Sequence, residues 1–178
     1  MGYAQRLIPH YTYEDWKLWE GKWELHEGYP IAMSPAPVPE HQRVANNIKT
    51  EFTFALKNCE DCVVYDPIDC VIADDVIFIP DALIVCKPIT KKYLDFTPAL
   101  VVEVLAPSTA LRDRVTKYAV YEKQGVKYYL IIDVEKRAVE IFENKNGAFE
   151  IAHISNNNFN FLLGEQGCSG NINLEEIW

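Results

Sequence analysis

The stretch Leu100-Val101-Val102-Glu103-Val104-Leu105 is almost continuously apolar and contains a single carboxylate. An apolar run of this kind is typical of a β-strand that is covered on both faces. A buried carboxylate without a partner is costly, so Glu103 needs either a pairing or a functional reason to be there. The stretch therefore predicts a central strand between two layers, with an acidic site residue within it.

The segments around this strand predict further strands and two substantial helices. Val44, Ile48 and Phe52 recur at helical spacing, so a helix is expected from about residue 40 to 58. A second helix is expected over residues 110–124. Short β-prone runs bounded by turn residues predict strands at 23–27, 29–33, 63–65, 70–72, 76–79, 82–86, 128–133, 138–142 and 149–154.

Together these elements predict an α/β (α+β) fold, in which a mixed β-sheet is flanked by helices. Thr12 and Asp15 have capping-box spacing and predict a short N-terminal helix, and a β-hairpin is expected around Gly28. Three prolines make residues 34–39 a rigid connector. The tail after residue 154 is Asn- and Gly-rich and ends in a short apolar segment. A length of 178 residues fits one domain over 1–178.

The charge of the chain is acidic and unevenly distributed. The formal net charge is -9, whereas DNA phosphates attract Lys and Arg. Residues 1–86 carry 14 acidic and 6 basic side chains, and residues 87–178 carry 12 and 11. Any DNA-facing surface should therefore come from the second half, and non-specific affinity for DNA should be weak.

The sequence also bears on compartment and on metal-binding cysteines. No apolar run approaches the roughly 20 residues that span a bilayer, and residues 1–6 lack a signal-peptide pattern, so we expect a cytoplasmic protein without a membrane partner. The odd count of five cysteines favours reduced thiols. Cys59-Glu60-Asp61-Cys62 has zinc-knuckle spacing, but no second Cys or His pair follows at a useful distance, so a zinc site is not expected.

Asp81 is the second acidic residue among β-prone runs, directly after Pro80. It precedes Glu103 by 22 residues (103 − 81), which leaves room for a strand, a connection and a return strand. If these strands are neighbours, the two carboxylates meet at one end of the sheet and form a hard-oxygen site suited to Mg²⁺ or Mn²⁺. The alternative is that Asp81 caps a turn and Glu103 pairs with a nearby basic residue.

Pro80-Asp81 and Glu103-Val104-Leu105 resemble the PD-(D/E)XK nuclease signature, except that Leu105 stands where that signature has lysine. The wider pattern resembles the Uma-two family of restriction-endonuclease-like proteins over roughly residues 12 to 145. The matching segments are 23–28 (WELHEG), 33–37 (MSPAP), 41–44 (HQRV), 79–81 (IPD), 101–109 (VVEVLAPST), Arg112-Asp113, Lys117, Tyr121 and 125–129 (GVKYY).

The resemblance implies that the lysine comes from the helix after Glu103, at Lys117. Asp113, Lys117 and Tyr121 are spaced i, i+4 and i+8 and so share a helical face. The alternative for this face is an exposed ion-pair stripe. Three further residues match the family and are supporting site residues, namely Glu24, His41 and Gln42; the alternatives for them are a cross-strand pair and polar residues at a helix start.

The implied reaction is metal-dependent hydrolysis of DNA phosphodiester bonds. Asp81, Glu103 and the backbone carbonyl of Val104 would hold one or two Mg²⁺ or Mn²⁺ ions, and Lys117 would position water or stabilise negative charge. Two alternatives remain: a catalytically inactive nuclease-fold module that binds or regulates, favoured by the missing strand lysine and the acidic charge, and a metal-dependent phosphatase, for which further ligands are lacking. Since many nucleases of this core act as dimers, we expect a homodimer; residues 139–142, with their potential as an exposed strand, and the aromatic-rich tail (Phe159, Phe161, Trp178) favour it, and the sequence leaves the pairing surface open.

Overall fold

The computed structural model describes residues 8–33, 37–165 and 167–178 of the chain. Residues 34–36 of the expected connector lie outside the described residues, as does the segment 1–6 on which the signal-peptide argument rests. No helix in the described part of the chain is long and apolar enough to cross a membrane.

A six-stranded mixed sheet forms the centre of the fold. The apolar stretch that contains Glu103 forms a central strand of this sheet, as expected, and all five residues of the strand, 100–104, are buried. It runs parallel to one neighbour, β8, and the other neighbouring pairs in the sheet are antiparallel. In spatial order the strands are β10 (Ala148–Ile154), β9 (Ala138–Lys145), β8 (Tyr128–Asp133), β7 (Leu100–Val104), β6 (Ala82–Val85) and β3 (Val63–Tyr65).

One face of this sheet is covered by helix α2 (Pro39–Ala55), which begins with the proline at its first turn. Its stripe of Val44, Ile48 and Phe52 is buried in the main core cluster, together with alternate residues of β6 and β7 such as Ala82 and Val102. The apolar stripe of the helix, with a period of 3.6 residues, therefore packs against the alternate apolar residues of the strands. Because a shift by one residue would expose those strand residues, this packing fixes the register of the strands.

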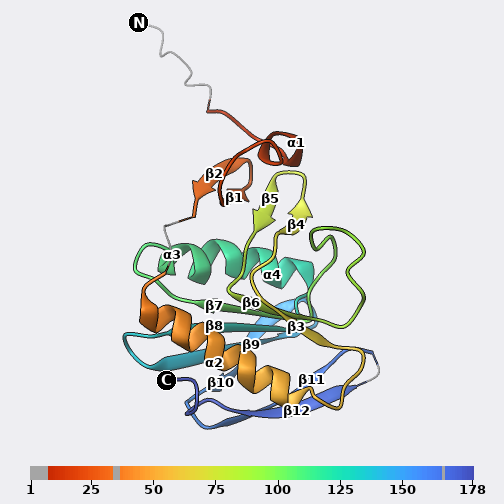
Figure 1. Ribbon diagram of the computed structural model, residues 1–178, viewed down its shortest axis with the longest axis vertical. Coiled ribbons are helices and arrows are strands. Elements are labelled where there is room, and N and C mark those ends of the chain that lie inside the picture. The colour runs from red at the N-terminus through yellow and green to blue at the C-terminus, as the bar shows by residue number, and fades with distance from the viewer. Residues whose placement is uncertain (1–7, 34–36, 166) are drawn as a thin grey trace, which may run out of the picture.

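The opposite face is covered by the helical segment after Glu103 (Figure 1). It was expected as one helix over 110–124, and it consists of α3 (Ala110–Arg112), a five-residue π-helical turn η1 (Asp113–Lys117) and α4 (Tyr118–Gln124). Widened π turns inside helices are frequent at functional sites. Gly125 ends the segment in the left-handed conformation, as sequence predicts.

A smaller sheet lies beside the central one and carries the N-terminal hairpin. Its strand order is β2 (Tyr29–Ala32), β1 (Trp23–His26), β5 (Val76–Phe78) and β4 (Cys70–Ala73). The short helix α1 (Tyr13–Trp16) precedes it, and the Asp15 carboxylate accepts a hydrogen bond from the Thr12 backbone N–H at 2.9 Å. Gly28 closes the hairpin at φ +79°, where a Cβ would overlap the His10 ring, so glycine is required there.

The Asn- and Gly-rich tail contains a hairpin that the sequence analysis missed. Its strands are β11 (Asn158–Leu163) and β12 (Cys168–Asn173), which pair with each other below α2 in Figure 1. Phe159, Phe161 and Leu163 point into the main core, while the residues between them are exposed. This period-2 alternation was the available signal, and the high asparagine content obscured it.

The structure contradicts the exposure that was expected for the two candidate dimer segments. Strand β9 lies between β8 and β10, so residues 139–142 are an interior strand, with Val139 and Ile141 buried. Phe159 and Phe161 of the tail are also buried in the core of the chain itself.

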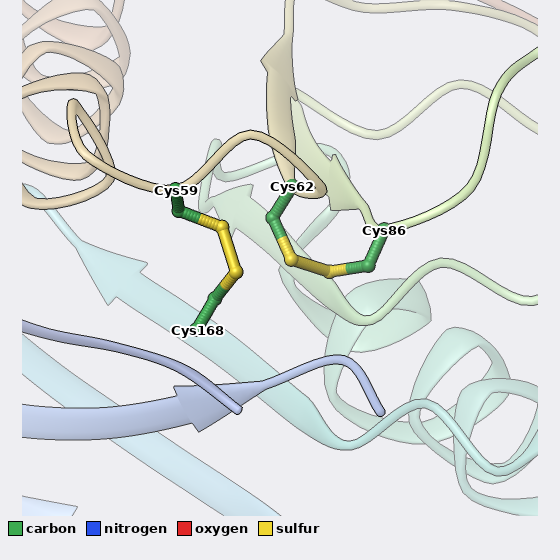
Figure 2. The surroundings of a disulfide bond; sticks show 4 residues. All are labelled: Cys59, Cys62, Cys86 and Cys168. Atoms are coloured by element: carbon green, nitrogen blue, oxygen red, sulfur yellow. A yellow bond between two sulfur atoms is a disulfide. The ribbon is translucent and has the colours of Figure 1, made fainter. Parts of the chain in front are cut away.

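The expectation of reduced thiols is wrong for four of the five cysteines. Cys59 is bonded to Cys168 and Cys62 to Cys86 (Figure 2). Cys70 is a buried free thiol. The argument from an odd number of cysteines failed because the unpaired one, Cys70, is a core residue, and the fold brings the other four together.

Candidate active site

The register of β6 and β7 brings the two expected acidic residues together. Ala82 lies opposite Val102, and the same register extended by one residue places Asp81 opposite Glu103. Asp81 Oδ2 accepts a hydrogen bond from the Val104 backbone N–H at 2.8 Å. Glu103 is 3% exposed, so its carboxylate lies inside the protein, on the face covered by the helical segment.

Lys117 reaches these carboxylates from the π-helical turn. Its Nζ lies 2.9 Å from Glu103 Oε1 and 2.8 Å from Glu24 Oε1, and the residue is only 4% exposed. The ammonium also lies 5.6 Å from the ring centroid of Phe78. The helical lysine suggested by the resemblance is therefore in contact with the strand carboxylate, although 14 residues separate them.

Glu24 is a full member of the site. Strand β1 pairs with β5, and this pairing carries Glu24 to the end of β5, where its Oε1 accepts a hydrogen bond from the Ile79 backbone N–H at 2.8 Å. Its other oxygen, Oε2, lies 2.9 Å from His26 Nε2. Because both oxygens are held, Glu24 is a fixed anion beside Lys117.

His41 and Gln42 separate in the structure. His41, near the start of α2, places Nε2 at 2.7 Å from the Val104 carbonyl oxygen and 3.5 Å from Asp81 Oδ2. Its Nδ1 is buried without a hydrogen-bond partner in the described residues. Gln42 does not line the cleft; its amide donates to the Pro37 carbonyl and so holds the start of the helix.

Tyr121 and Asp113 complete the helical face. The Tyr121 hydroxyl donates to Glu103 Oε1 at 3.2 Å, the oxygen that also contacts Lys117. Asp113 Oδ1 lies 3.5 Å from Lys117 Nζ, and the Asp113 carbonyl accepts a hydrogen bond from the Tyr129 hydroxyl at 2.8 Å. The expected i, i+4, i+8 face is thus directed into the protein and is not an exposed ion-pair stripe.

The environment of the site separates the pKa values of its carboxylates. Burial would raise the pKa of Glu24, but Lys117, His26 and the Ile79 N–H together lower it to about 2. Burial also raises the pKa of Glu103 well above its usual range; Lys117 opposes this shift, and the charges of Asp113, Asp81 and Glu24 add to it. Burial raises the pKa of Asp81 as well, against the opposing effect of His41.

The charge of the site suits a divalent cation. Burial would lower the pKa of Lys117, but the carboxylates of Glu103, Glu24 and Asp113 raise it further, so the lysine stays charged. Four carboxylates, those three and Asp81, then face one ammonium and leave a charge of −3 when all are ionised. A divalent cation would offset this excess and favour the ionised forms of Glu103 and Asp81, against the burial that raises their pKa values.

The donor set fits Mg²⁺ or Mn²⁺ as well. The hydrogen bonds to Asp81 and Glu103 described above fall on one oxygen of each carboxylate, Oδ2 and Oε1. The Val104 carbonyl oxygen, expected as a ligand, accepts its hydrogen bond from His41. In the part of the chain that the structure describes, clusters of three metal-ligand atoms within 4.8 Å comprise cysteines alone. Asp81 and Glu103 therefore do not form a preassembled cluster of three ligands, and Mg²⁺ held by these two carboxylates would complete its shell with water and phosphate oxygens.

A cleft of about 130 Å³ opens onto these residues. Its lining includes Glu24, His41, Asp81, Glu103 and Lys117, and also Arg112, which was not among the expected site residues. Arg112 Nη2 lies 3.4 Å from the Ser108 carbonyl oxygen, and its Nε is buried without a partner in the described residues. The basic residue next to Asp113 was the available signal for a group that can bind phosphate.

Comparisons with known proteins identify the family and the fold. The model of the Uma2 family, described as "Putative restriction endonuclease", matches residues 11–174. A crystal structure described as "a putative nuclease belonging to DUF820 from Anabaena variabilis" is similar in fold, with a TM-score of 0.74 and 14% sequence identity over 93% of this chain and 96% of that chain. The search of curated proteins gives no match. The family resemblance and the expected mixed α+β fold are confirmed.

Proposed function

Because this chain belongs to the Uma2 family of restriction-endonuclease-like proteins, we propose that it is a metal-dependent endonuclease that hydrolyses DNA phosphodiester bonds. The observation that carries the proposal is the contact between Lys117 Nζ and Glu103 Oε1 at 2.9 Å, with Asp81 opposite Glu103. Two acids and a lysine are the groups that the nuclease signature requires, and here the helix provides the lysine that Leu105 replaces in the strand.

The proposed role of each residue follows from its contacts. Asp81, Glu103 and the Val104 carbonyl would hold Mg²⁺ or Mn²⁺, which supplies Lewis acidity and lowers the pKa of water when bound. Lys117, held by Glu24, would place its positive charge beside the phosphate as negative charge develops there. Tyr121 orients Glu103 through its hydroxyl.

Two further side chains have proposed roles: Arg112 would contact the DNA phosphate, and His41 would position the Val104 carbonyl. Arg112 lines the mouth of the cleft and would bind a non-bridging phosphate oxygen. His41 contacts both the Val104 carbonyl and Asp81 and would hold these two groups in register.

The test is cleavage of double-stranded and single-stranded DNA by the purified protein with Mg²⁺ or Mn²⁺ and with EDTA. Glu103→Gln keeps the size of the side chain and removes its charge, and we expect cleavage to fall by at least two orders of magnitude. Glu150→Gln, an exposed residue on β10, is the matched control and should cleave like the parent protein. Thermal melts check that both variants fold.

Cleavage that is unaffected by Glu103→Gln, or by EDTA, would refute the assignment. The alternative function, an inactive nuclease-fold binding module, is favoured by the full pairing of Lys117 with carboxylates and by the net charge of -9. Under that alternative no condition produces metal-dependent cleavage, and calorimetry detects DNA binding but no Mg²⁺ binding that depends on Asp81 and Glu103.

A homodimer acting on cytoplasmic DNA is part of the proposal, because one copy offers one site and a duplex has two strands. Because β9 lies between β8 and β10, residues 139–142 have no free strand edge through which a dimer could pair. Sedimentation equilibrium at several concentrations tests this, and a single species of 20.4 kDa throughout would contradict it.

A further inference from the structure

Four cysteines from three separate parts of the chain gather at one end of the central sheet (Figure 2). Cys59 and Cys62 lie between α2 and β3, Cys86 directly follows β6, and Cys168 begins β12. The sulfur atoms of Cys59, Cys62 and Cys168 all lie within 4.8 Å of one another, and Cys86 is bonded to Cys62. This cluster is therefore a single group of four sulfurs, and not two unrelated pairs.

The cluster is separate from the acidic site. Asp81 and Cys86 lie at opposite ends of β6, five residues apart, which corresponds to about 17 Å along an extended strand. The nuclease proposal does not use these cysteines, and their arrangement needs its own account.

We propose that the four cysteines form a tetrathiolate Zn²⁺ site in the reduced protein, and that the two disulfides are the oxidised, metal-free state of the same site. The spacing Cys59-Glu60-Asp61-Cys62 is that of a zinc knuckle, and the fold supplies Cys86 and Cys168 as the second pair. The sequence conceals this pair, because those two cysteines are 82 residues apart (168 − 86).

The distances agree with a tetrahedral site. A Zn–S bond is about 2.3 Å, so neighbouring sulfurs in a tetrahedral tetrathiolate lie about 3.8 Å apart. Three of the sulfurs already lie within 4.8 Å of one another, and the fourth, Cys86, is bonded to one of them, Cys62, so that after reduction its side chain would turn towards the other three. Four thiolates leave no open position, which is typical of structural zinc and not of catalytic zinc.

The two states are related by a balanced reaction. A dithiol or phosphine reductant supplies four electrons, and with four protons these convert two disulfides into four thiols. Binding of Zn²⁺ then releases the four protons, because thiolates are the ligands. The disulfides join the end of α2 to β12 and the start of β3 to the end of β6, whereas a zinc ion would join all four segments at one point.

The surroundings leave room for both states. Cys86 and Cys168 line a hollow of about 480 Å³, whose charged lining residues are two lysines and two acids (Lys87, Lys127, Asp61 and Glu165). At Gly164 a Cβ would lie 3.4 Å from the sulfurs of both Cys62 and Cys86, so glycine keeps this space open.

The experiment measures zinc in the full-length protein after reduction with a phosphine, which competes less for Zn²⁺ than a dithiol does. We expect one tightly held Zn²⁺ per chain, a tetrathiolate absorption spectrum when Co²⁺ is substituted, and four sulfur ligands by zinc X-ray absorption. The unreduced protein should bind no zinc at this site and should carry two disulfides by mass spectrometry.

Variants separate this site from others. Cys59→Ser/Cys62→Ser should lose the bound zinc, whereas Cys70→Ala, which removes the buried free thiol, should retain it. Asp81→Asn should also retain it, because the acidic site is separate. Reduced parent protein that binds no zinc, or whose zinc shell contains fewer than three sulfurs, would overturn the proposal even if the cysteine variants fail to fold.

Discussion

Replacement of Lys117 by Met removes the one ammonium from the buried acidic site and keeps most of the side-chain volume. Lys117 is 4% exposed and lies 2.8 Å from Glu24 and 2.9 Å from Glu103. Loss of one partner from a buried ion pair costs about 3–5 kcal/mol, because the remaining charge is left buried and unpaired. We therefore expect the free energy of unfolding at pH 7 to fall by that amount.

The pKa of Glu24 gives an independent magnitude. It is about 2 in the folded protein against an ordinary value of 4.5. Because it is lowered, its contribution to stability is fully present above pH 4.5 and is lost as the pH falls towards 2. If the loss of Lys117 returns this pKa to its ordinary value, the cost is about 3.4 kcal/mol, from 1.36 kcal/mol for each pKa unit.

The loss in free energy of unfolding caused by Lys117→Met should also depend on pH. Without the ammonium, the pKa of Glu103, already raised by burial, loses the charge that lowers it, so the folded variant takes up a proton as the pH falls. The stability difference between Lys117→Met and the parent should therefore shrink between pH 8 and pH 5. Urea unfolding followed by circular dichroism measures it, and adding Glu24→Gln to the variant should recover at least about 1 kcal/mol.

A surface lysine provides the control. Lys136 lies 3.1 Å from Asp133 with its side chain 76% exposed, and Lys136→Met should change stability by less than about 0.5 kcal/mol. A deficit for Lys117→Met below about 1 kcal/mol, or one that is the same at pH 5 and pH 8, would refute the paired-ammonium account.

Three further predictions follow from the same contacts. Tyr121→Phe removes the hydroxyl that donates to Glu103, and urea unfolding should show a loss of about 0.5–1.5 kcal/mol; a larger loss would indicate that the ring is displaced. Glu24→Gln should destabilise the protein at pH 7 by about 2–3 kcal/mol, and thermal melts should show this difference vanishing as the pH falls from 4.5 towards 2; a constant difference would contradict the lowered pKa. Phe52→Ala, in the core beside Phe161, should cost about 3–5 kcal/mol by urea unfolding, and a loss below about 1 kcal/mol would place Phe52 outside the core.

Periodicity predicted most of the fold where one face of an element is buried. The stripe of α2 and the apolar strand around Glu103 both lie where the sequence placed them. The β11–β12 hairpin was missed because asparagines at its exposed positions resemble loop composition. The π turn at Asp113–Lys117 was also missed, since a single extra residue in a helical turn leaves the surrounding periodicity almost unchanged.

The site was predictable to the extent that its residues break a pattern. Glu103 interrupts an apolar strand, and the register of β6 and β7 then brings Asp81 beside it. The contact between Glu24 and Lys117 depends on the packing of the small sheet against the helical segment, which local sequence does not encode. The same limit applies to the cysteine cluster, whose members approach one another only through long-range topology.

The most direct test of the proposed nuclease site is a crystal structure of the protein soaked in Mn²⁺, measured at a wavelength that gives anomalous scattering from manganese. The account predicts an anomalous peak that contacts the carboxylates of both Asp81 and Glu103, with Lys117 Nζ still beside Glu103. A structure without a peak between these two residues, or with their carboxylates turned apart, would contradict it.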